Sequence, residues 1–216
     1  MEYTECPNCG ASTKSGFFAN AIIPKKHIQL VNEYTENNSE AYCKKCSQSI
    51  LDRAIRAAQK DFEDAKSAFE NLLPSIPILS IHHPHGWDYQ SFGIVTGQSV
   101  TGTGVISEIS SSFTDFFGTQ SGAFSSKLAK GELNCMNQLR LKAVKMGCNA
   151  IIGADIDYAE VGSIKGMLMV CMTGTAIKLK NLTEVGYDQN IFIKITSLTD
   201  TMEHIRSLMP DWTGFK

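Results

Sequence analysis

Apolar side chains recur between residues 50 and 73 at intervals that alternate between four and three residues. They are Leu51, Ile55, Ala58, Phe62, Ala65, Phe69 and Leu72. Mostly charged or polar residues lie between them, so the spacing predicts one amphipathic helix with a narrow apolar seam. Two prolines, Pro74 and Pro77, end the pattern. The seam packs either within its own chain or against a partner helix, because both arrangements remove it from water.

The segment 78–180 has the patterns of several strands and one long helix. Runs rich in apolar and β-branched residues predict strands at 92–100, 105–109, 149–158 and 167–179. A helix is predicted at 121–147, with Gly147 at its end and one apolar stripe along its length. The stripe comprises Leu128, Cys135, Leu139, Ala143 and Met146. We therefore expect an α+β fold in which an antiparallel sheet packs on one long helix.

These patterns divide the chain into four parts. Residues 1–49 form a polar module, 50–76 a helical linker, 77–180 the α+β domain and 181–216 a C-terminal extension. Within the extension, the apolar run 191–196 predicts a strand. Asp200 with Glu203 three residues later then predicts the start of a short helix. The extension is thus expected to be a strand followed by a helix.

Four of the seven cysteines form two close pairs in the first part of the chain. The pairs are Cys6-Pro-Asn-Cys9-Gly10 and Cys43-Lys-Lys-Cys46. Such spacing lets two thiolates from one tight turn reach the same ion, and four thiolates make a closed, structural zinc site. We predict one zinc per chain in a zinc-ribbon-like module with two or three short strands between the pairs. The alternatives are two redox pairs or four buried thiols, and His27 lies either beside the ion or on the surface.

Several motifs between Ile78 and Lys180 carry a family resemblance. They are Gly93-Ile-Val-Thr-Gly97 with Ser99-Val100, Gly122-Ala-Phe124, the run from Ala143 to Tyr158, Met167-Leu-Met-Val170 and Gly174-Thr175-Ala176. With these motifs in order, the segment resembles the YbjQ-like family, which is labelled heavy-metal-binding. The resemblance implies a dodecin-like subunit that assembles as a homo-oligomeric ring, with a pentamer expected, and it implies no established reaction. Gly131 departs from the family pattern, since the family helix usually carries a helix-forming residue there. A glycine inside a helix costs about 1 kcal/mol.

An acidic cluster in the predicted strand 149–158 is a second candidate site. Asp155 and Asp157 lie two residues apart, so both carboxylates point to one face, with Tyr158 next to them. Together with Glu160, such a pair could hold a hard cation or share a proton. The alternative is a solvated strand face, or pairing with lysines of a neighbouring subunit.

A histidine triplet precedes the first predicted strand. His82, His83 and His85 lie within four residues, and imidazoles are ligands for zinc, copper or nickel. Adjacent residues of an extended chain face opposite ways, so two of the three can share one ion. The alternative is a surface turn without a metal.

Composition and charge restrict the classes of function. The net charge of −2 argues against electrostatic binding of nucleic acid or of an anionic membrane. The sequence has no run of 18 apolar residues and no basic, then apolar, leader, so we expect a cytoplasmic protein. The remaining cysteines, Cys135, Cys148 and Cys171, are expected to be buried and inert, and no nucleophile motif accompanies them.

We therefore expect a non-enzymatic, zinc-containing, ring-forming assembly and binding protein. Its zinc module would display a surface for protein partners, with Phe17, Phe18 and Tyr42 as candidate exposed aromatic residues. The alternative is a protein that binds a metal ion or small molecule in clefts between subunits, through Asp155, Asp157 and Tyr158 or through the histidine triplet. A hydrolase assembled between subunits is a third, weaker hypothesis.

Overall fold

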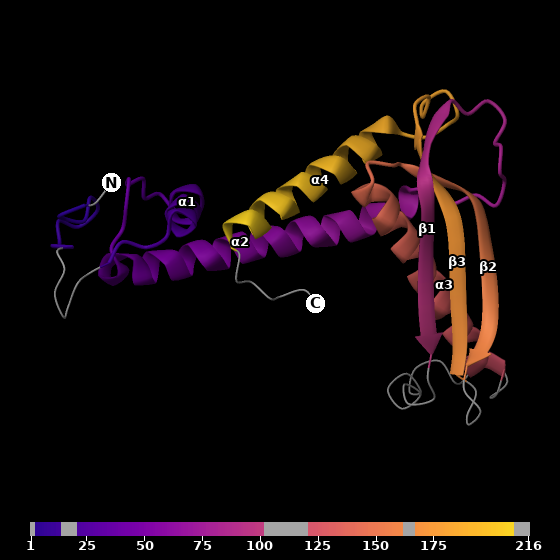
Figure 1. Ribbon diagram of the computed structural model, residues 1–216, viewed down its shortest axis with the longest axis horizontal. Coiled ribbons are helices and arrows are strands. Elements are labelled where there is room, and N and C mark those ends of the chain that lie inside the picture. Colours follow the sequence, from indigo (N-terminus) through magenta and orange to yellow (C-terminus); the bar gives the residue numbers. More distant parts are fainter. Residues whose placement is uncertain (1–2, 14–20, 102–120, 162–166, 210–216) are drawn as a thin grey trace. The chain divides into compact units, whose positions relative to one another are not determined.

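The computed structural model describes residues 3–13, 21–101, 121–161 and 167–209, which form two compact units (Figure 1). The first unit comprises Met1–Glu70 with Thr196–Lys216, and the second comprises Asn71–Ile195. The predicted strand at 105–109 lies outside the described residues, as do Phe17 and Phe18.

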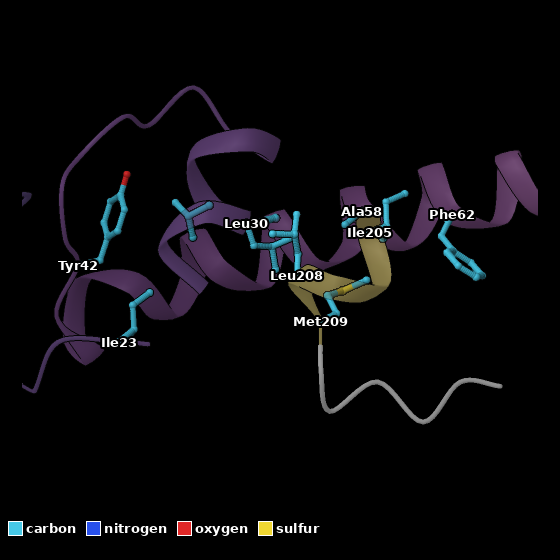
Figure 2. Packing of buried hydrophobic residues seen from close by; sticks show 10 residues of the cluster. Ile23, Leu30, Tyr42, Ala58, Phe62, Ile205, Leu208 and Met209 are labelled. Carbon is cyan, nitrogen blue, oxygen red and sulfur yellow. The ribbon is translucent and has the colours of Figure 1, made fainter. Parts of the chain in front are cut away.

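The first unit is built from three helices around one core. Helix α1 spans Lys25–Tyr34, α2 spans Lys44–Leu72 and α4 spans Gln189–Leu208, and α4 contributes its residues from Thr196 onward. Figure 2 shows side chains from all three helices gathered in this core. The core comprises Ile23, Leu30, Val31, Tyr42, Ala54, Ala58, Phe62, Ile205, Leu208 and Met209. Burial of these apolar side chains is the main force that holds the unit together.

The seam of the predicted 50–73 helix faces this core with its N-terminal part, from Leu51 to Phe62. Ala58 and Phe62 are fully buried, and the guanidinium carbon of Arg206 lies 5.3 Å from the centre of the Phe62 ring. This part of the seam therefore packs within its own chain, against α1 and α4. A 3-10 turn at Leu73–Ser75 follows α2, because proline cannot continue the helical hydrogen bonds.

The predicted strand at 191–196 is wrong, since these residues belong to α4. The alternating, β-branched run Ile191-Phe-Ile-Lys-Ile-Thr196 imitates a strand locally. Its buried members, Phe192 and Ile195, are instead three residues apart, and Ile205 and Leu208 repeat that spacing further along. The longer helical stripe outweighs the local strand preference, and Asp200 lies inside the helix rather than at its start.

The second unit contains a three-stranded antiparallel sheet in the order β1-β3-β2. The strands are β1 (Tyr89–Thr101), β2 (Ala150–Val161) and β3 (Met167–Leu179), close to the predicted ranges. The segment before β1 runs parallel to β2: Ile78 is bridged to Ile151, and the Leu79 N–H donates to the Ile151 carbonyl at 2.9 Å. The sheet thus confirms the antiparallel α+β class.

Helix α3 (Ser121–Lys145) shares a buried cluster with one face of this sheet. Cys135, Leu139 and Ala143 are fully buried, as the predicted stripe requires. Met146 is the exception, since it lies beyond the last turn and is 36% exposed. Helix and sheet approach closely at Gly97, where an added Cβ would lie 2.5 Å from the carbonyl oxygen of Cys135.

Side chains of α3 also occupy the outer edge of β1. The Gln138 amide donates to the Gln98 carbonyl at 2.8 Å and accepts from the Gln98 N–H at 3.1 Å. The Lys142 ammonium donates to the Thr96 carbonyl at 2.6 Å. These bonds take the place of a neighbouring strand, so this part of the edge is not available for pairing with another sheet.

The sheet face opposite α3 carries apolar side chains in water. Ile94 is 78% exposed and Val100 is 56% exposed, and Phe92 on the same strand is also exposed. They alternate with Val95 and Gly97, which face α3, so the pleat places them on the open side.

In the described part of the chain, no helix is long and apolar enough to cross a membrane.

Candidate metal centre

The sulfur atoms of Cys6, Cys9, Cys43 and Cys46 all lie within 4.8 Å of one another. The Cys6 and Cys46 sulfurs are 3.7 Å apart, and the Cys9 and Cys43 sulfurs are also 3.7 Å apart. Each of these two close pairs joins one CxxC motif to the other. The two motifs, separated by more than thirty residues in sequence, therefore meet at one point.

The first pair is presented by a tight turn. The Gly10 N–H donates to the Cys6 carbonyl at 2.8 Å, and Gly10 has a φ of +69°, which favours glycine. An antiparallel bridge between Glu5 and Ser12 closes the turn. Residues 3–13 thus form a small loop, here called the N-terminal knuckle, that holds two sulfurs on one side.

The second pair lies at the start of a long helix. Cys43 directly precedes α2, and Cys46 is in its first turn. The Ile22 to Cys43 bridge fixes the chain just before the helix. Between the two pairs, the described residues contain helix α1 where we expected short strands, and its Leu30 and Val31 are buried in the core of the first unit.

The sulfur positions fit a tetrahedral metal ion. Zinc–thiolate bonds are about 2.3 Å long, so a regular tetrahedron of four thiolates places the sulfurs about 3.8 Å apart. Two of the distances between the motifs, 3.7 Å each, agree with that value, and the other sulfur pairs lie within 4.8 Å. Four thiolates leave no ligand position for water or substrate, which is the arrangement of a structural site.

Hydrogen bonds and burial act differently on the individual thiols. Burial opposes ionisation of Cys6, but backbone N–H groups of Cys9, Asn8 and Cys43 outweigh it and lower the Cys6 pKa to about 7. Burial raises the pKa of Cys46 to about 12. The Ala11 N–H favours the Cys9 thiolate, yet desolvation and the adjacent Cys6 and Cys43 thiols together raise the Cys9 pKa. A divalent cation would reverse this crowding effect, because a coordinated thiol loses its proton.

Hydrogen-bond donors contact the sulfurs from both motifs. The Cys43 N–H donates to the Cys6 sulfur at 3.2 Å, and the Asn8 side-chain amide donates to the Cys46 sulfur at 3.5 Å. Such donors orient thiolates and reduce their charge. Sequence analysis missed Asn8, although its position between the two cysteines of the first pair was a signal for this role. Lys44 and Lys45 lie exposed between the cysteines of the second pair, where their charge would offset that of a tetrathiolate site.

Tyr42 differs from its expected role near this centre, and His27 is also placed. Tyr42 is fully buried, so it is not an exposed contact residue, and its hydroxyl donates to Asn32 at 2.6 Å. This bond gives the buried Tyr42 hydroxyl a hydrogen-bond partner inside the core of the first unit. His27 is partly buried in α1 and is not among the converging ligands.

The acidic pair on β2 lies together, as predicted, but no third metal-binding side chain of the described residues joins it. Asp155 and Asp157 are both exposed and pair in register with Thr173 and Cys171. Their strand neighbour Ile156 packs against the α3 cluster, so the carboxylates lie on the open sheet face. The Tyr158 hydroxyl donates to Glu132 on α3 at 2.8 Å, so the Tyr158 side chain lies on the other face of the sheet, away from the two carboxylates. The side chain of Glu160 lies outside the described residues.

The histidine triplet does not converge on a common point. His82, His83 and His85 are all exposed, and the His83 imidazole contacts the Tyr89 hydroxyl at 3.2 Å. The ring of His82 lies over Gly153, where an added Cβ would be 2.7 Å from its Nδ1. Within the described ranges, the four cysteines are the one group of three or more metal-binding side chains that the structure brings together.

The three other cysteines are not equivalent. Burial raises the pKa of Cys135 and Cys148, both of which are buried as expected. Cys171 is half-buried on the open sheet face, which differs from the expected burial. Its strand position opposite Asp157 explains the difference.

Comparison with known proteins places the α+β part of the chain in a family. A family model described as "Putative heavy-metal-binding" matches residues 79–180. A UPF0145 protein of Anoxybacillus flavithermus is 41% identical over 91 residues, which cover 42% of this chain and 85% of that protein. A UPF0145 protein of Clostridium botulinum is 36% identical over 85 residues, which cover 39% and 80%.

A solved structure is also similar to this chain. It is a DUF74-family protein of unknown function from Pediococcus pentosaceus, with 15% identity and a TM-score of 0.36. The similarity covers 48% of this chain and 96% of that one. The matched segment 79–180 does not include the four cysteines of the metal centre.

Proposed function

Since the chain belongs to the YbjQ-like UPF0145 family, we propose that it is a non-enzymatic, zinc-containing assembly and binding protein. In this proposal the first unit holds one structural zinc through the four cysteines. The α+β unit associates with copies of itself in a dodecin-like ring, with a pentamer expected from the family resemblance. The metal site lies outside the segment to which the family description applies.

The observation that carries the zinc proposal is the arrangement of the four sulfurs. Their two cross-pair separations of 3.7 Å match a tetrahedron about one ion. A bound ion would also supply folding free energy to residues 3–13, a segment too short to stabilise itself by burial. Sulfur ligands select zinc or another soft metal over magnesium or calcium.

The open sheet face supports the assembly proposal. Ile94 is 78% exposed in the middle of a strand, with Phe92 two residues before it and Val100 further along the same strand, and monomers seldom leave such an apolar surface in water. Association through the face also agrees with the outer edge of β1, which Gln138 and Lys142 already occupy at Gln98 and Thr96. We propose that subunits associate through the face of the sheet.

Asp155 and Asp157 favour a second candidate function, the binding of a cation or small polar molecule between subunits. Both carboxylates lie on the same open face as Ile94, and neither makes an ion pair within the described residues. A neighbouring subunit on this face would enclose them and supply further ligands.

The partner of the first unit is proposed to be a protein rather than nucleic acid, because the net charge is −2.

We also propose a cytoplasmic location, where thiols remain reduced and available to zinc.

The test of the function combines elemental analysis with light scattering on the purified full chain. We expect one equivalent of zinc per chain and a mass several times the monomer mass. A zinc-free protein with an ordered first unit would contradict the metal proposal, and a monomeric mass at micromolar concentration would contradict the assembly proposal.

A further inference from the structure

The four sulfurs of the metal centre differ in their access to water. Cys6 is 2% exposed and Cys43 is fully buried, whereas Cys46 is partly buried and Cys9 is exposed. Oxidation of thiolates follows exposure, because the oxidant must reach the sulfur. Cys9 is therefore the sulfur that a small oxidant in solution reaches first.

Cys9 has a partner in position across the two motifs. Its sulfur lies 3.7 Å from the Cys43 sulfur. The other cysteine of its own motif, Cys6, is held toward the start of α2 by the Cys43 N–H at 3.2 Å and lies 3.7 Å from the Cys46 sulfur. Oxidation that begins at Cys9 thus has Cys43 within reach, and the contacts that hold Cys6 against Cys46 and the Cys43 N–H favour Cys43 over Cys6 as the second thiol.

We propose that the metal centre is a peroxide-sensitive switch, in which oxidation of Cys9 releases the ion and links Cys9 to Cys43. The inference rests on the proposed zinc site. It goes beyond a purely structural role, because the same four residues would then respond to hydrogen peroxide, a two-electron oxidant, by releasing the ion.

The chemistry balances with one peroxide per disulfide. The Cys9 thiolate attacks one oxygen of hydrogen peroxide, the O–O bond breaks, and hydroxide leaves while Cys9 becomes a sulfenic acid. The Cys43 thiolate then attacks the Cys9 sulfur, an S–S bond forms, the S–O bond breaks, and a second hydroxide leaves. The two thiolates supply the two electrons that reduce the peroxide, and two protons from solvent convert both hydroxides to water.

The cross-motif disulfide has a structural consequence. It removes two of the four ligands, so the remaining pair, Cys6 and Cys46, would hold the ion too weakly to retain it. It also keeps the N-terminal knuckle joined to the start of α2, because Cys9 belongs to the knuckle and Cys43 directly precedes the helix. A disulfide within one motif would instead leave the knuckle without its sulfur contacts to residues 41–46, among them Cys6 to the Ala41 carbonyl at 4.0 Å. The proposed link is therefore reversible without loss of the site.

The test uses the full chain after its zinc content has been measured. Hydrogen peroxide is added, released zinc is followed with a chromogenic chelator, and disulfides are mapped by mass spectrometry of a non-reduced digest. We expect one zinc released per peroxide consumed and a Cys9–Cys43 link, and a reductant with added zinc should restore the metal content. The matched control is Cys171→Ser, which removes a partly exposed thiol outside the centre and should release zinc at the same rate.

Two results would overturn the switch. One is retention of zinc at peroxide concentrations that oxidise glutathione in the same solution. The other is a disulfide within a motif, Cys6–Cys9 or Cys43–Cys46, as the first product. A chain that contains no zinc before peroxide is added would instead refute the zinc site itself, so failure of the proposed function is distinguished from failure of the switch.

Discussion

Gly131 of α3 and Val170 of β3 approach so closely that a Cβ added at Gly131 would lie 2.8 Å from the Val170 Cγ2 atom. Real Cβ atoms do not tolerate such a separation, and Val170 is fully buried with little room to move. An internal glycine destabilises the helix by about 1 kcal/mol, but it allows this close approach to the sheet. The departure of Gly131 from the family pattern thus has a steric cause.

Replacement of Gly131 by alanine is expected to destabilise the second unit by about 1–3 kcal/mol, although alanine favours helix. The reason is overpacking against Val170. Urea unfolding, followed by a probe in the second unit, measures the change. The double variant Gly131→Ala with Val170→Ala should lose less than the sum of the single changes, because the smaller side chain makes room. An increase in stability for Gly131→Ala alone would contradict the packing described here.

The variant Cys43→Ser is expected to lose zinc and to unfold the first unit while the second unit stays folded. Structural zinc contributes on the order of 10 kcal/mol to small domains, and removal of one of four ligands forfeits much of it. Elemental analysis and hydrogen exchange resolved by segment measure both effects. Cys171→Ser, outside the centre, is the matched control and should keep its zinc.

Phe62→Ala is expected to destabilise the first unit by about 3–5 kcal/mol, because it empties a fully buried position in the core. The mass of any oligomer should not change, since the Phe62 ring packs within its own chain. Chemical unfolding and light scattering on the same sample separate the two effects. Loss of assembly with normal unfolding would show that the seam of α2 serves a partner helix instead.

Ile94→Glu is expected to reduce the oligomer mass at micromolar concentration without unfolding the subunit. A carboxylate at this position faces water in the free subunit but would be buried unpaired in the proposed interface. Leu133→Glu is the matched control, because Leu133 is 52% exposed on α3 and lies away from the open sheet face. Equal masses for both variants and the unaltered chain would exclude this face from assembly.

Thiol labelling should rank the cysteines of the second unit by exposure. Burial raises the pKa of Cys135 and Cys148, so at pH 7.5 they hold less thiolate than an ordinary cysteine. In a subunit that does not assemble, such as the Ile94→Glu variant, iodoacetamide is expected to modify half-buried Cys171 first. Labelling of the other two should accelerate only as the pH rises toward their raised pKa. Fast labelling of Cys135 in folded protein at neutral pH would contradict its burial.

The elements that the sequence predicted well are those whose pattern is set by local spacing. Helix α3 and strands β1, β2 and β3 follow regular apolar periods over ten residues or more, and their ranges were close to correct. The first half of α4 was wrong, because its alternation of β-branched residues is a local signal that packing along the whole helix overrules. Helix α1 was missed because ten residues with few buried positions carry little periodicity.

The candidate sites show the same distinction. The four cysteines were predictable, since CxxC spacing already brings each pair together before the chain folds. The roles of His82 and Tyr158 were not predictable, because they depend on Gly153 and Glu132, which are distant in sequence. The open sheet face was not predictable either, since the strand pattern does not state which side α3 covers.

The position of the second cysteine pair also bears on how the first unit folds. The Ser47 N–H donates to the Cys43 carbonyl at 3.0 Å, which is the first bond of the α2 hydrogen-bond series. Starting a helix is its slowest and least favourable step, because several residues must be fixed before one bond is gained. An ion shared by Cys43 and Cys46 would fix that first turn in advance. Metal capture would then act as the nucleation event for 29 residues of helix, so the rate at which the first unit folds should depend on the concentration of free zinc.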